Sequence, residues 1–167
     1  LGFTPSLEGE EGEAILSNER GDRSEIGLPP HRIERLQKLK ASGLPLVVIL
    51  AGGSSVASPD LLELADALIY IWYPGEQGGT AVARVLFGDV SPSGKLPITF
   101  PMSLDQLPPF EDYSMEGRTY RFFHGEPLFP FGYGLSYASF AYRDARVDKS
   151  RINIGDSVRV TATVTNA

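Results

Sequence analysis

The chain contains no cysteine and only two histidines among its 167 residues. Without cysteine there is no disulfide, no thiolate metal site and no cysteine nucleophile. His31 and His124 stand isolated, without patterned carboxylates and without an acid–serine pair nearby in the sequence. We therefore expect neither a zinc site nor a serine hydrolase, and no cofactor.

Long apolar runs and clusters of basic residues are absent as well. The longest apolar run, residues 44–51, is far too short to span a bilayer, so no membrane partner is expected. The formal net charge is -6 and no run of Lys or Arg occurs. This disfavours nucleic acid as a partner, because binding a polyanion needs clustered cations. Composition leaves the compartment open, and we favour the periplasm or secretion over the cytoplasm.

The apolar content, 42% of all residues, is sufficient for a packed core. Residues 46–50 and 67–72 are continuous apolar runs, typical of parallel strands buried on both faces. Helices are expected after Pro29-Pro30, at residues 60–65 and at residues 80–86. This alternation predicts an α/β fold: a layered α/β sandwich with a mostly parallel sheet, in which the two strands are central and are neighbours or near neighbours.

The remaining segments have a different character. Residues 1–28 are rich in Gly and Glu without apolar periodicity, which predicts a loop. Residues 96–100 predict a short strand, and residues 101–137 predict long ordered loops with short strands. Apolar and polar residues alternate along residues 157–166, as in a half-buried antiparallel strand. We expect this strand to open a β-sandwich that is truncated at Ala167.

Five groups of segments, in order along the chain, resemble glycoside hydrolase family 3. A single group would carry little weight, whereas five in order over residues 1–140 indicate the family. They are LEGEE (7–11) with GDR (21–23) and LP (28–29); WYPGEQGG (72–79) with VLFGD (85–89); PSGKLP (92–97) with TFP (99–101); GRTYRF (117–122); and PLFPFGYGLSY (127–137).

The resemblance implies a domain organisation and an activity. Residues 1–138 would be the family's C-terminal α/β sandwich domain, and residues 139–167 the incomplete start of a fibronectin type III-like domain. Enzymes of this family remove single sugars from the non-reducing ends of β-linked glycosides with retention of configuration. The expected substrate is a β-glucoside or β-xyloside. A TIM-type barrel, the expected partner domain, would supply the Asp nucleophile, while this domain would supply the Glu acid/base. Homo-oligomerisation stays open.

The acidic cluster in residues 8–13 is where the acid/base is expected. The resemblance implies that one of Glu8, Glu10 and Glu11 has this role, with Glu8 the first choice and the other two as alternatives. Such a carboxyl must remain protonated near neutral pH, so burial or a like charge has to raise its pKa. The competing interpretation is a solvated acidic loop. It would leave a non-catalytic carbohydrate-binding or interaction module on the same fold.

Other residues of the matching segments have two interpretations each. For Asp22 and Arg23 we favour a structural pairing over contact with substrate. For Trp72 and Tyr73, core packing competes with stacking on a sugar ring, and packing is the more common role of a Trp that ends an apolar strand. The glycines of residues 75–79 lack the Gly-Lys-Ser/Thr ending of a phosphate-binding loop. They predict a tight turn from strand to helix instead.

Overall fold

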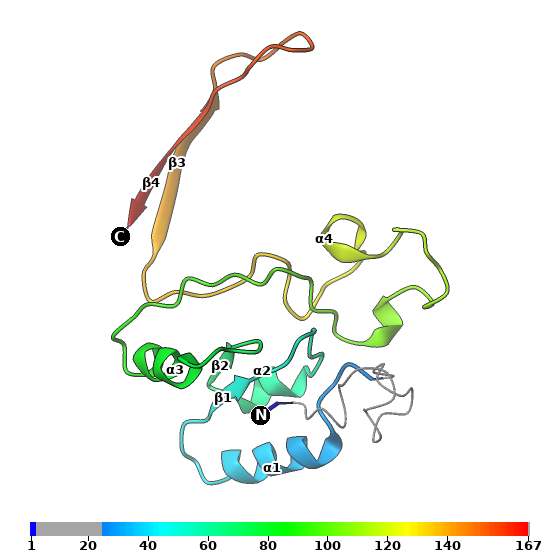
Figure 1. The fold of residues 1–167 in the computed structure, drawn as a ribbon, viewed down its shortest axis with the longest axis vertical. Helices are drawn as coiled ribbons and strands as arrows, with labels where there is room; N and C mark the ends of the chain where they lie inside the picture. The colour runs from blue at the N-terminus through cyan, green and yellow to red at the C-terminus, as the bar shows by residue number, and fades with distance from the viewer. Residues whose placement is uncertain (3–24, 167) are drawn as a thin grey trace.

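The computed structural model describes residues 1–2 and 25–166 (Figure 1). Helices and strands alternate in the first half of this region, two short helical turns interrupt the loops that follow, and a pair of strands lies at the C-terminal end. The elements are α1 (Pro30–Lys40), β1 (Val47–Leu50), α2 (Asp60–Leu64), β2 (Ala67–Tyr70), α3 (Gly78–Leu86), the 3₁₀ turn η1 (Leu104–Gln106), α4 (Thr119–Phe122), β3 (Phe140–Val147) and β4 (Val160–Asn166).

The strands β1 and β2 form a parallel pair, as the sequence predicted. Their register runs from Val47 opposite Ala67 to Leu50 opposite Tyr70. The single short helix α2 connects them, and one helix is enough to return the chain to a neighbouring parallel strand. This βαβ unit confirms the predicted α/β class and the predicted adjacency of the two strands.

The core lies on one face of this pair. Val48 and Leu50 alternate onto the same face of β1, where Leu36 of α1 and Leu61 of α2 pack against them. All four side chains are at most 4% exposed. Complete burial of an aliphatic side chain is worth about 1.5–3 kcal/mol. This small cluster is therefore the main source of stability for the α/β unit.

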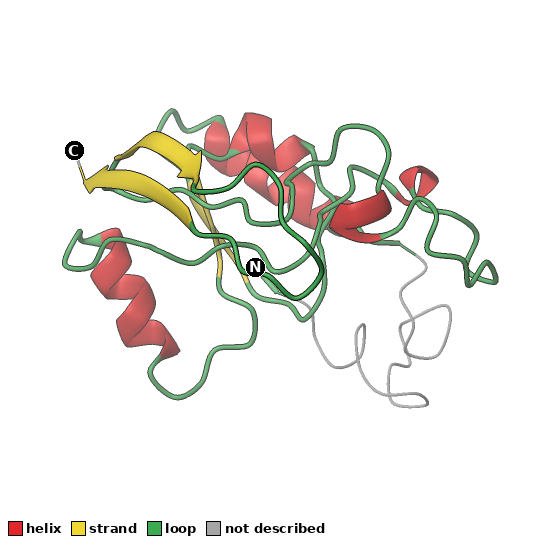
Figure 2. Cartoon of the chain, turned by 90° about the horizontal axis from the view of Figure 1, so that it is seen from above, coloured by secondary structure: helices red, strands yellow, loops and turns green. Residues whose placement is uncertain are grey.

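The opposite face of β1 is less covered than a strand buried on both faces would be. Figure 2 shows α3 across the strands from α1, so helices do lie on both sides of the pair. However, none of the residues of α3 is buried, and Val47 remains 43% exposed. For β1 the prediction of burial on both faces is therefore correct for one face only, and no residue of β2 is fully buried.

The helix α1 has the boundaries that its flanking residues predict. Pro30 occupies the first turn, where its missing N–H leaves no hydrogen bond unmade. Lys38 and Lys40 lie in the last turn, where positive charge favours the carboxyl end of the helix dipole. Gly43 then adopts φ 76°, a left-handed conformation that ends the helix at little steric cost.

Loops make up most of the chain between α3 and β3 (Figure 2). The strand predicted at residues 96–100 is not formed as a continuous element. Leu96 and Phe100 each donate a backbone N–H, to Tyr133 and Phe129 respectively. Pro97 lies between these two contacts and has no N–H to donate, so the ladder is interrupted. The strands predicted within residues 101–137 are likewise replaced by η1, α4 and one isolated bridge.

The aromatic loop after residue 128 braces this region. Phe129 and Phe100 exchange both backbone hydrogen bonds, at 2.9 and 3.3 Å. Tyr133 stacks on Phe129 with ring centroids 5.1 Å apart. Lys95 donates to the Gly134 carbonyl, and a Cβ on Gly134 would lie 2.3 Å from the Gly94 carbonyl oxygen. Glycine is therefore required where the two segments cross.

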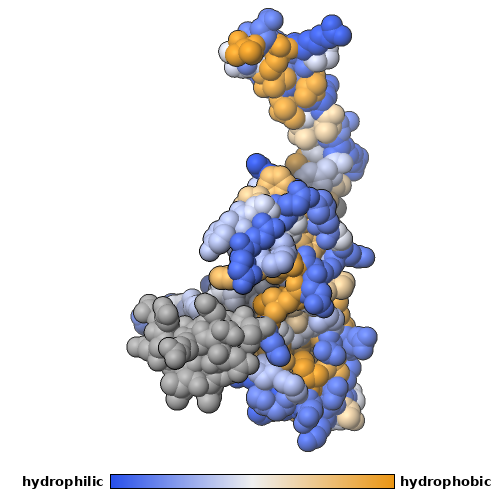
Figure 3. All heavy atoms as spheres, turned by 90° about the vertical axis from the view of Figure 1, so that its right-hand side faces the viewer, coloured by the Kyte–Doolittle hydropathy of each residue, from blue (hydrophilic) through white to orange (hydrophobic). Residues whose placement is uncertain are grey.

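β3 and β4 form an antiparallel hairpin that projects from the α/β unit (Figure 1). The alternating pattern thus predicted an antiparallel strand correctly, although the strand begins at Val160 and is exposed along its whole length rather than half-buried. Apolar side chains occupy one face of the hairpin and stay exposed, with Tyr142 at 73% and Val160 at 68%. Figure 3 shows apolar atoms along this projection. The residues of this apolar hairpin face are Phe140, Tyr142, Val147, Val160, Ala162 and Val164.

A side-chain clip joins the amino ends of the two parallel strands. The Leu46 N–H donates to Asp66 Oδ2 at 2.7 Å, and Lys40 Nζ lies 2.9 Å from Asp66 Oδ1. The hydrogen bond from Leu46, followed by that from Lys40, lowers the pKa of Asp66 below its ordinary value of 3.8.

Replacing Asp66 with Asn should destabilise the chain in a pH-dependent manner. A carboxyl group with a lowered pKa in the folded state stabilises the fold above its unfolded pKa and loses this effect as pH falls through the folded value. The urea midpoint of Asp66→Asn should therefore lie below that of the unmodified chain at pH 7. The two midpoints should converge once the pH is well below 3.8. A midpoint difference that persists unchanged in acid would contradict this account.

The apolar hairpin face should make the isolated chain self-associate, because an exposed contiguous apolar surface tends to be buried between molecules. The double substitution Val160→Thr with Val164→Thr should shift the chain toward monomer in sedimentation velocity. Thr163→Ser with Thr165→Ser alters the opposite face of β4 and serves as the matched control, which should leave the distribution unchanged. Equal distributions for all three chains would show that this face does not mediate association.

Candidate functional site

The first described residues of the chain pair with the end of β1. The Leu1 nitrogen donates to the Ile49 carbonyl at 2.7 Å, and the Ala51 N–H donates to the Leu1 carbonyl at 2.8 Å. Gly2 and Ala51 form a parallel bridge, and the Arg32 guanidinium donates to the Gly2 carbonyl. This stretch thus continues the parallel pairing beside β1, whereas the sequence had predicted a loop from the first residue onward.

The chain is described again from Glu25, and it returns to the same region. The Ala57 N–H donates to the Ile26 carbonyl at 2.7 Å. Two residues later, the Leu28 N–H donates to Ser58 Oγ, also at 2.7 Å. Both hydrogen bonds join residues 26–28 to the turn that follows β1. The side chain of Leu28 is part of the core.

The described residues on either side of segment 3–24 are therefore held at the end of β1, by Gly2, and at the turn that follows β1, by Ile26 and Leu28. In open sheets of parallel strands, ligands bind outside the carboxyl ends, where the loops of adjacent strands meet. We call this region the carboxyl edge.

The carboxyl end of β2 contributes two aromatic side chains to this edge. The Trp72 ring packs edge-on against Tyr70, with centroids 4.7 Å apart, and against Phe100 at 6.3 Å. These contacts favour the packing interpretation of Trp72 over sugar stacking. Tyr73 is 62% exposed and its ring lies over Gly53, where a Cβ would be 2.7 Å from Tyr73 Cε2.

The glycines between β2 and α3 support the predicted tight turn at one position. A Cβ on Gly78 would lie 2.5 Å from Pro74 Cβ, closer than two carbon atoms can approach without movement. Gly75 and Gly79 face open space. Close packing therefore explains the glycine at position 78, the first residue of α3, but not the glycines at positions 75 and 79.

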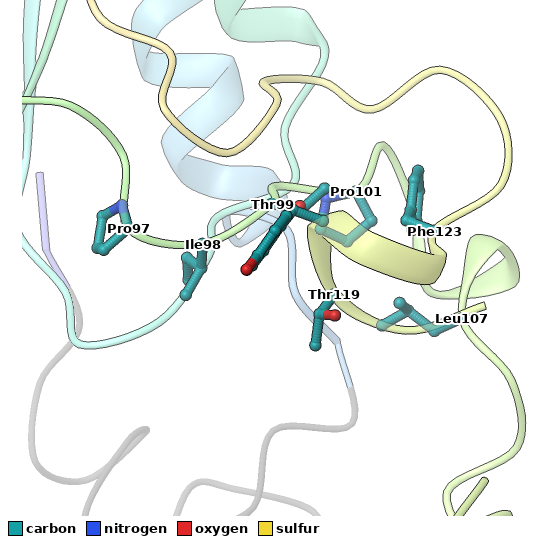
Figure 4. A pocket seen from close by; sticks show the side chains of 8 residues that line it. Pro97, Ile98, Thr99, Pro101, Leu107, Thr119 and Phe123 are labelled. Atoms are coloured by element: carbon teal, nitrogen blue, oxygen red, sulfur yellow. The ribbon is translucent and has the colours of Figure 1, made fainter. Parts of the chain in front are cut away.

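A pocket of about 310 Å³ opens between the 97–101 segment and the α4 region (Figure 4). Pro97, Ile98 and Thr99 line one side, while Leu107 and Thr119 lie across from them. The described lining contains no carboxylate and no histidine. This pocket offers apolar surface and hydroxyl groups but no side chain suited to general acid/base chemistry near neutral pH.

The described carboxyl groups with shifted pKa values are also unsuited to proton donation. The pKa of Asp66 is lowered as stated above, and the backbone hydrogen bond from Ser114 lowers the pKa of Asp112. A general acid working near neutral pH needs a raised pKa instead. Neither group, then, is a candidate for the acid/base.

The acidic candidates from the sequence, unlike Trp72 and Tyr73, lie outside the described residues. This applies to the three catalytic candidates Glu8, Glu10 and Glu11, and to Asp22 and Arg23. What the structure adds is the position of both anchors of the segment that carries them. Ser58 was missed in the sequence, because a single Ser before a Pro carries no signal of a partner 30 residues away.

Comparisons with known proteins identify the family of the chain. The model of the glycosyl hydrolase family 3 C-terminal domain matches residues 4–137. Over 148 residues the chain is 50% identical to a xylan 1,4-beta-xylosidase of Xylanibacter ruminicola, covering 88% of this chain and 17% of that protein. Over 163 residues it is 37% identical to a periplasmic beta-glucosidase of Salmonella typhimurium, covering 90% and 21%.

A solved structure gives the same result. The chain superimposes on a family 3 beta-glucosidase of Bifidobacterium adolescentis with a TM-score of 0.78 and 35% identity, covering 92% of this chain and 24% of that one. A parallel pair of strands with helices on both sides defines a layered α/β domain. The chain belongs to glycoside hydrolase family 3 and contains the C-terminal domain of that family. It spans about a fifth of the length of these relatives.

The turn before α3 offers a matched pair of substitutions. Gly78→Ala should lower the melting temperature, because the new Cβ meets the Pro74 ring. Gly79→Ala should raise it slightly, because its Cβ enters open space and Ala is favoured over Gly in a helix by about 1 kcal/mol. Thermal denaturation of both variants tests the turn. Equal effects of the same sign would show that the close approach to Pro74 does not constrain this position.

Proposed function

We propose that this chain supplies the general acid/base of a retaining, exo-acting β-glycosidase. Its substrate would be a β-linked glucoside or xyloside, cleaved at the terminal non-reducing sugar. The acid/base would be a Glu of residues 8–11, and an Asp of a TIM-type barrel domain would act as nucleophile. The acidic cluster lies within segment 3–24. The observation that carries this proposal is that the described residues on both sides of this segment are held at the carboxyl edge.

The anchors support the proposal because of where they direct the segment. Gly2 lies beside Ala51 at the end of β1. Ile26 and Leu28 are hydrogen-bonded to Ala57 and Ser58 in the turn that follows. The intervening residues must therefore begin and end at the edge where α/β domains bind ligands. A run of carboxylates tethered there is suited to meet a substrate held by a second domain.

The chemistry requires two carboxyl groups with different roles. In retaining hydrolysis they lie about 5–5.5 Å apart, and one attacks the anomeric carbon while the other protonates the leaving oxygen. The second group then removes a proton from the water that releases the sugar. A carboxyl on a segment that docks against another domain loses solvent on docking, which raises its pKa and keeps the proton in place.

Among the three candidates, Glu8 is our first choice, followed by Glu10 and then Glu11. The LEGEE motif that contains them precedes Asp22-Arg23 and then Leu28-Pro29, which is the order of the family motifs described above. The relatives named above include both a xylosidase and a glucosidase, so both sugars belong in the test. The barrel pocket would decide between them.

We also propose that a separate β-sandwich domain begins at residue 139. The family match ends at residue 137, and β3 begins at Phe140. β3 and β4 pair with each other and with no other strand of the described chain.

No helix in the described residues is long and apolar enough to cross a membrane.

A chimera tests the assignment of the acid/base. The matching segment of the Xylanibacter ruminicola xylosidase would be replaced by that of this chain, which is 50% identical to it. Glu8→Ala should then slow a natural β-linked disaccharide by about 10²–10⁴-fold, the usual contribution of a general acid. An aryl glycoside with a good leaving group needs little protonation and should be slowed far less. Added azide should restore its turnover, because a small anion replaces the activated water.

The controls separate the alternatives. Glu25→Ala lies outside the cluster and should leave both substrates unaffected. The isolated 167-residue chain should be inactive, since one carboxyl cannot serve on both sides of the bond. If Glu10→Ala shows the substrate difference and Glu8→Ala does not, the order of the candidates is wrong. If no variant of the cluster distinguishes the two substrates, the chain is a non-catalytic module and the proposal fails.

A further inference from the structure

Tyr73 is an aromatic residue that the fold displays at the carboxyl edge instead of burying it. Just past β2, the Ile71 N–H still donates to the Leu50 carbonyl at 2.9 Å. Trp72 follows and packs edge-on against Tyr70. Tyr73 comes next and is 62% exposed. A single exposed apolar side chain is ordinary, so its meaning depends on what holds the ring in place.

Two unfavourable features of the backbone are tolerated around this ring. Trp72 adopts φ 54°, a left-handed conformation that is rare for a bulky residue, and it turns the chain immediately before Tyr73. Gly53, in the loop after β1, lies under the ring, where a Cβ would be 2.7 Å from Tyr73 Cε2. Any residue other than glycine would displace the ring. Backbone strain of this kind is characteristic of functional sites.

The loop beneath the ring is fixed to β2. The Tyr70 hydroxyl donates to the carbonyl of Ser54, the residue after Gly53. The Tyr70 ring also packs against Trp72, with centroids 4.7 Å apart. The loops after two adjacent parallel strands therefore meet at Tyr73. This is the location, outside the carboxyl ends of the strands, at which α/β domains bind ligands.

We infer that Tyr73 is a stacking platform for a sugar ring of the substrate, an inference that rests on the proposed function. A sugar ring has a face of C–H groups and a rim of hydroxyl groups. The C–H face packs on the electron-rich face of an aromatic ring. The platform binds and orients the sugar and takes no part in proton transfer. It acts through the substrate alone, whichever carboxyl group is the acid/base.

Packing of Tyr73 against another part of a longer protein makes a different prediction. Apolar packing needs contact area, which Leu largely keeps. Stacking needs the flat aromatic face, so Phe would replace Tyr while Leu would not. A contact made equally to the substrate and to the transition state raises KM when it is lost and leaves kcat unchanged.

The experiment measures KM and kcat of the chimera described above on a β-linked disaccharide. Tyr73→Leu should raise KM by about threefold to tenfold, the effect of losing one aromatic contact, and should leave kcat unchanged. Tyr73→Phe should keep the KM of the unmodified chimera. Tyr113→Leu is the matched control, because Tyr113 is 89% exposed but lies in the loop before α4. It should change neither constant.

Gly53→Ala tests the platform without altering the ring itself. The new Cβ meets the far end of an exposed side chain, so the ring moves and the backbone is not forced to. KM should rise as it does for Tyr73→Leu, with little change in melting temperature. The double variant should have the KM of Tyr73→Leu alone, because both substitutions remove the same contact.

The inference is overturned if Tyr73→Leu leaves KM unchanged, if Tyr73→Phe raises KM as much as Tyr73→Leu, or if the effects of Tyr73→Leu and Gly53→Ala are fully additive. If Tyr73→Leu does not accumulate as folded protein, Gly53→Ala decides under the same criterion. Failure of the proposed function gives a different result. Should Tyr73→Leu raise KM while no Glu variant of the acidic cluster distinguishes the two substrates, the domain binds sugar without supplying the acid/base.

Discussion

Burial of one face of β1 is the constraint on which the rest of this domain depends. Val48 and Leu50 are covered by Leu36 of α1 and Leu61 of α2, and this contact sets the order of the layers. It also holds the turn after β1 in place, because Val56 in that turn belongs to the same cluster. The anchors of the acidic segment attach to this turn, so the geometry of the carboxyl edge depends on the core beneath it.

The hydrogen bonds at the edge differ in kind from those that stabilise the core. The clip formed by Asp66 joins strands that already pair, and it lies at the amino ends, away from the candidate site. The contacts of Ala51, Ala57 and Ser58 instead join the α/β unit to the residues that flank segment 3–24. The contacts of Asp66 and those of Ala51 therefore lie at opposite ends of the parallel pair.

The sequence predicted the elements whose cause is local. The apolar run before Ala51, the Pro29-Pro30 start of α1 and the alternation in residues 157–166 each reflect a pattern within a few residues. It failed at residues 96–100, where Pro97 interrupts a ladder whose partner is some 30 residues further along the chain. It could not identify Ser58 or the pairing of Gly2 either, because both depend on contacts between distant segments. The choice among the three Glu candidates came from family resemblance, and the structure locates the anchors of their segment.

The packing of Trp72 has a practical consequence for work on this chain. It is the only tryptophan in the sequence, and its indole lies 4.7 Å from Tyr70 and 6.3 Å from Phe100. Fluorescence excited at wavelengths that only tryptophan absorbs therefore comes from the Trp72 indole alone. This indole joins the carboxyl end of β2 to the aromatic brace formed by Phe100 and Phe129. The emission spectrum is a built-in optical signal for whether these two parts of the domain remain in contact, without any attached label.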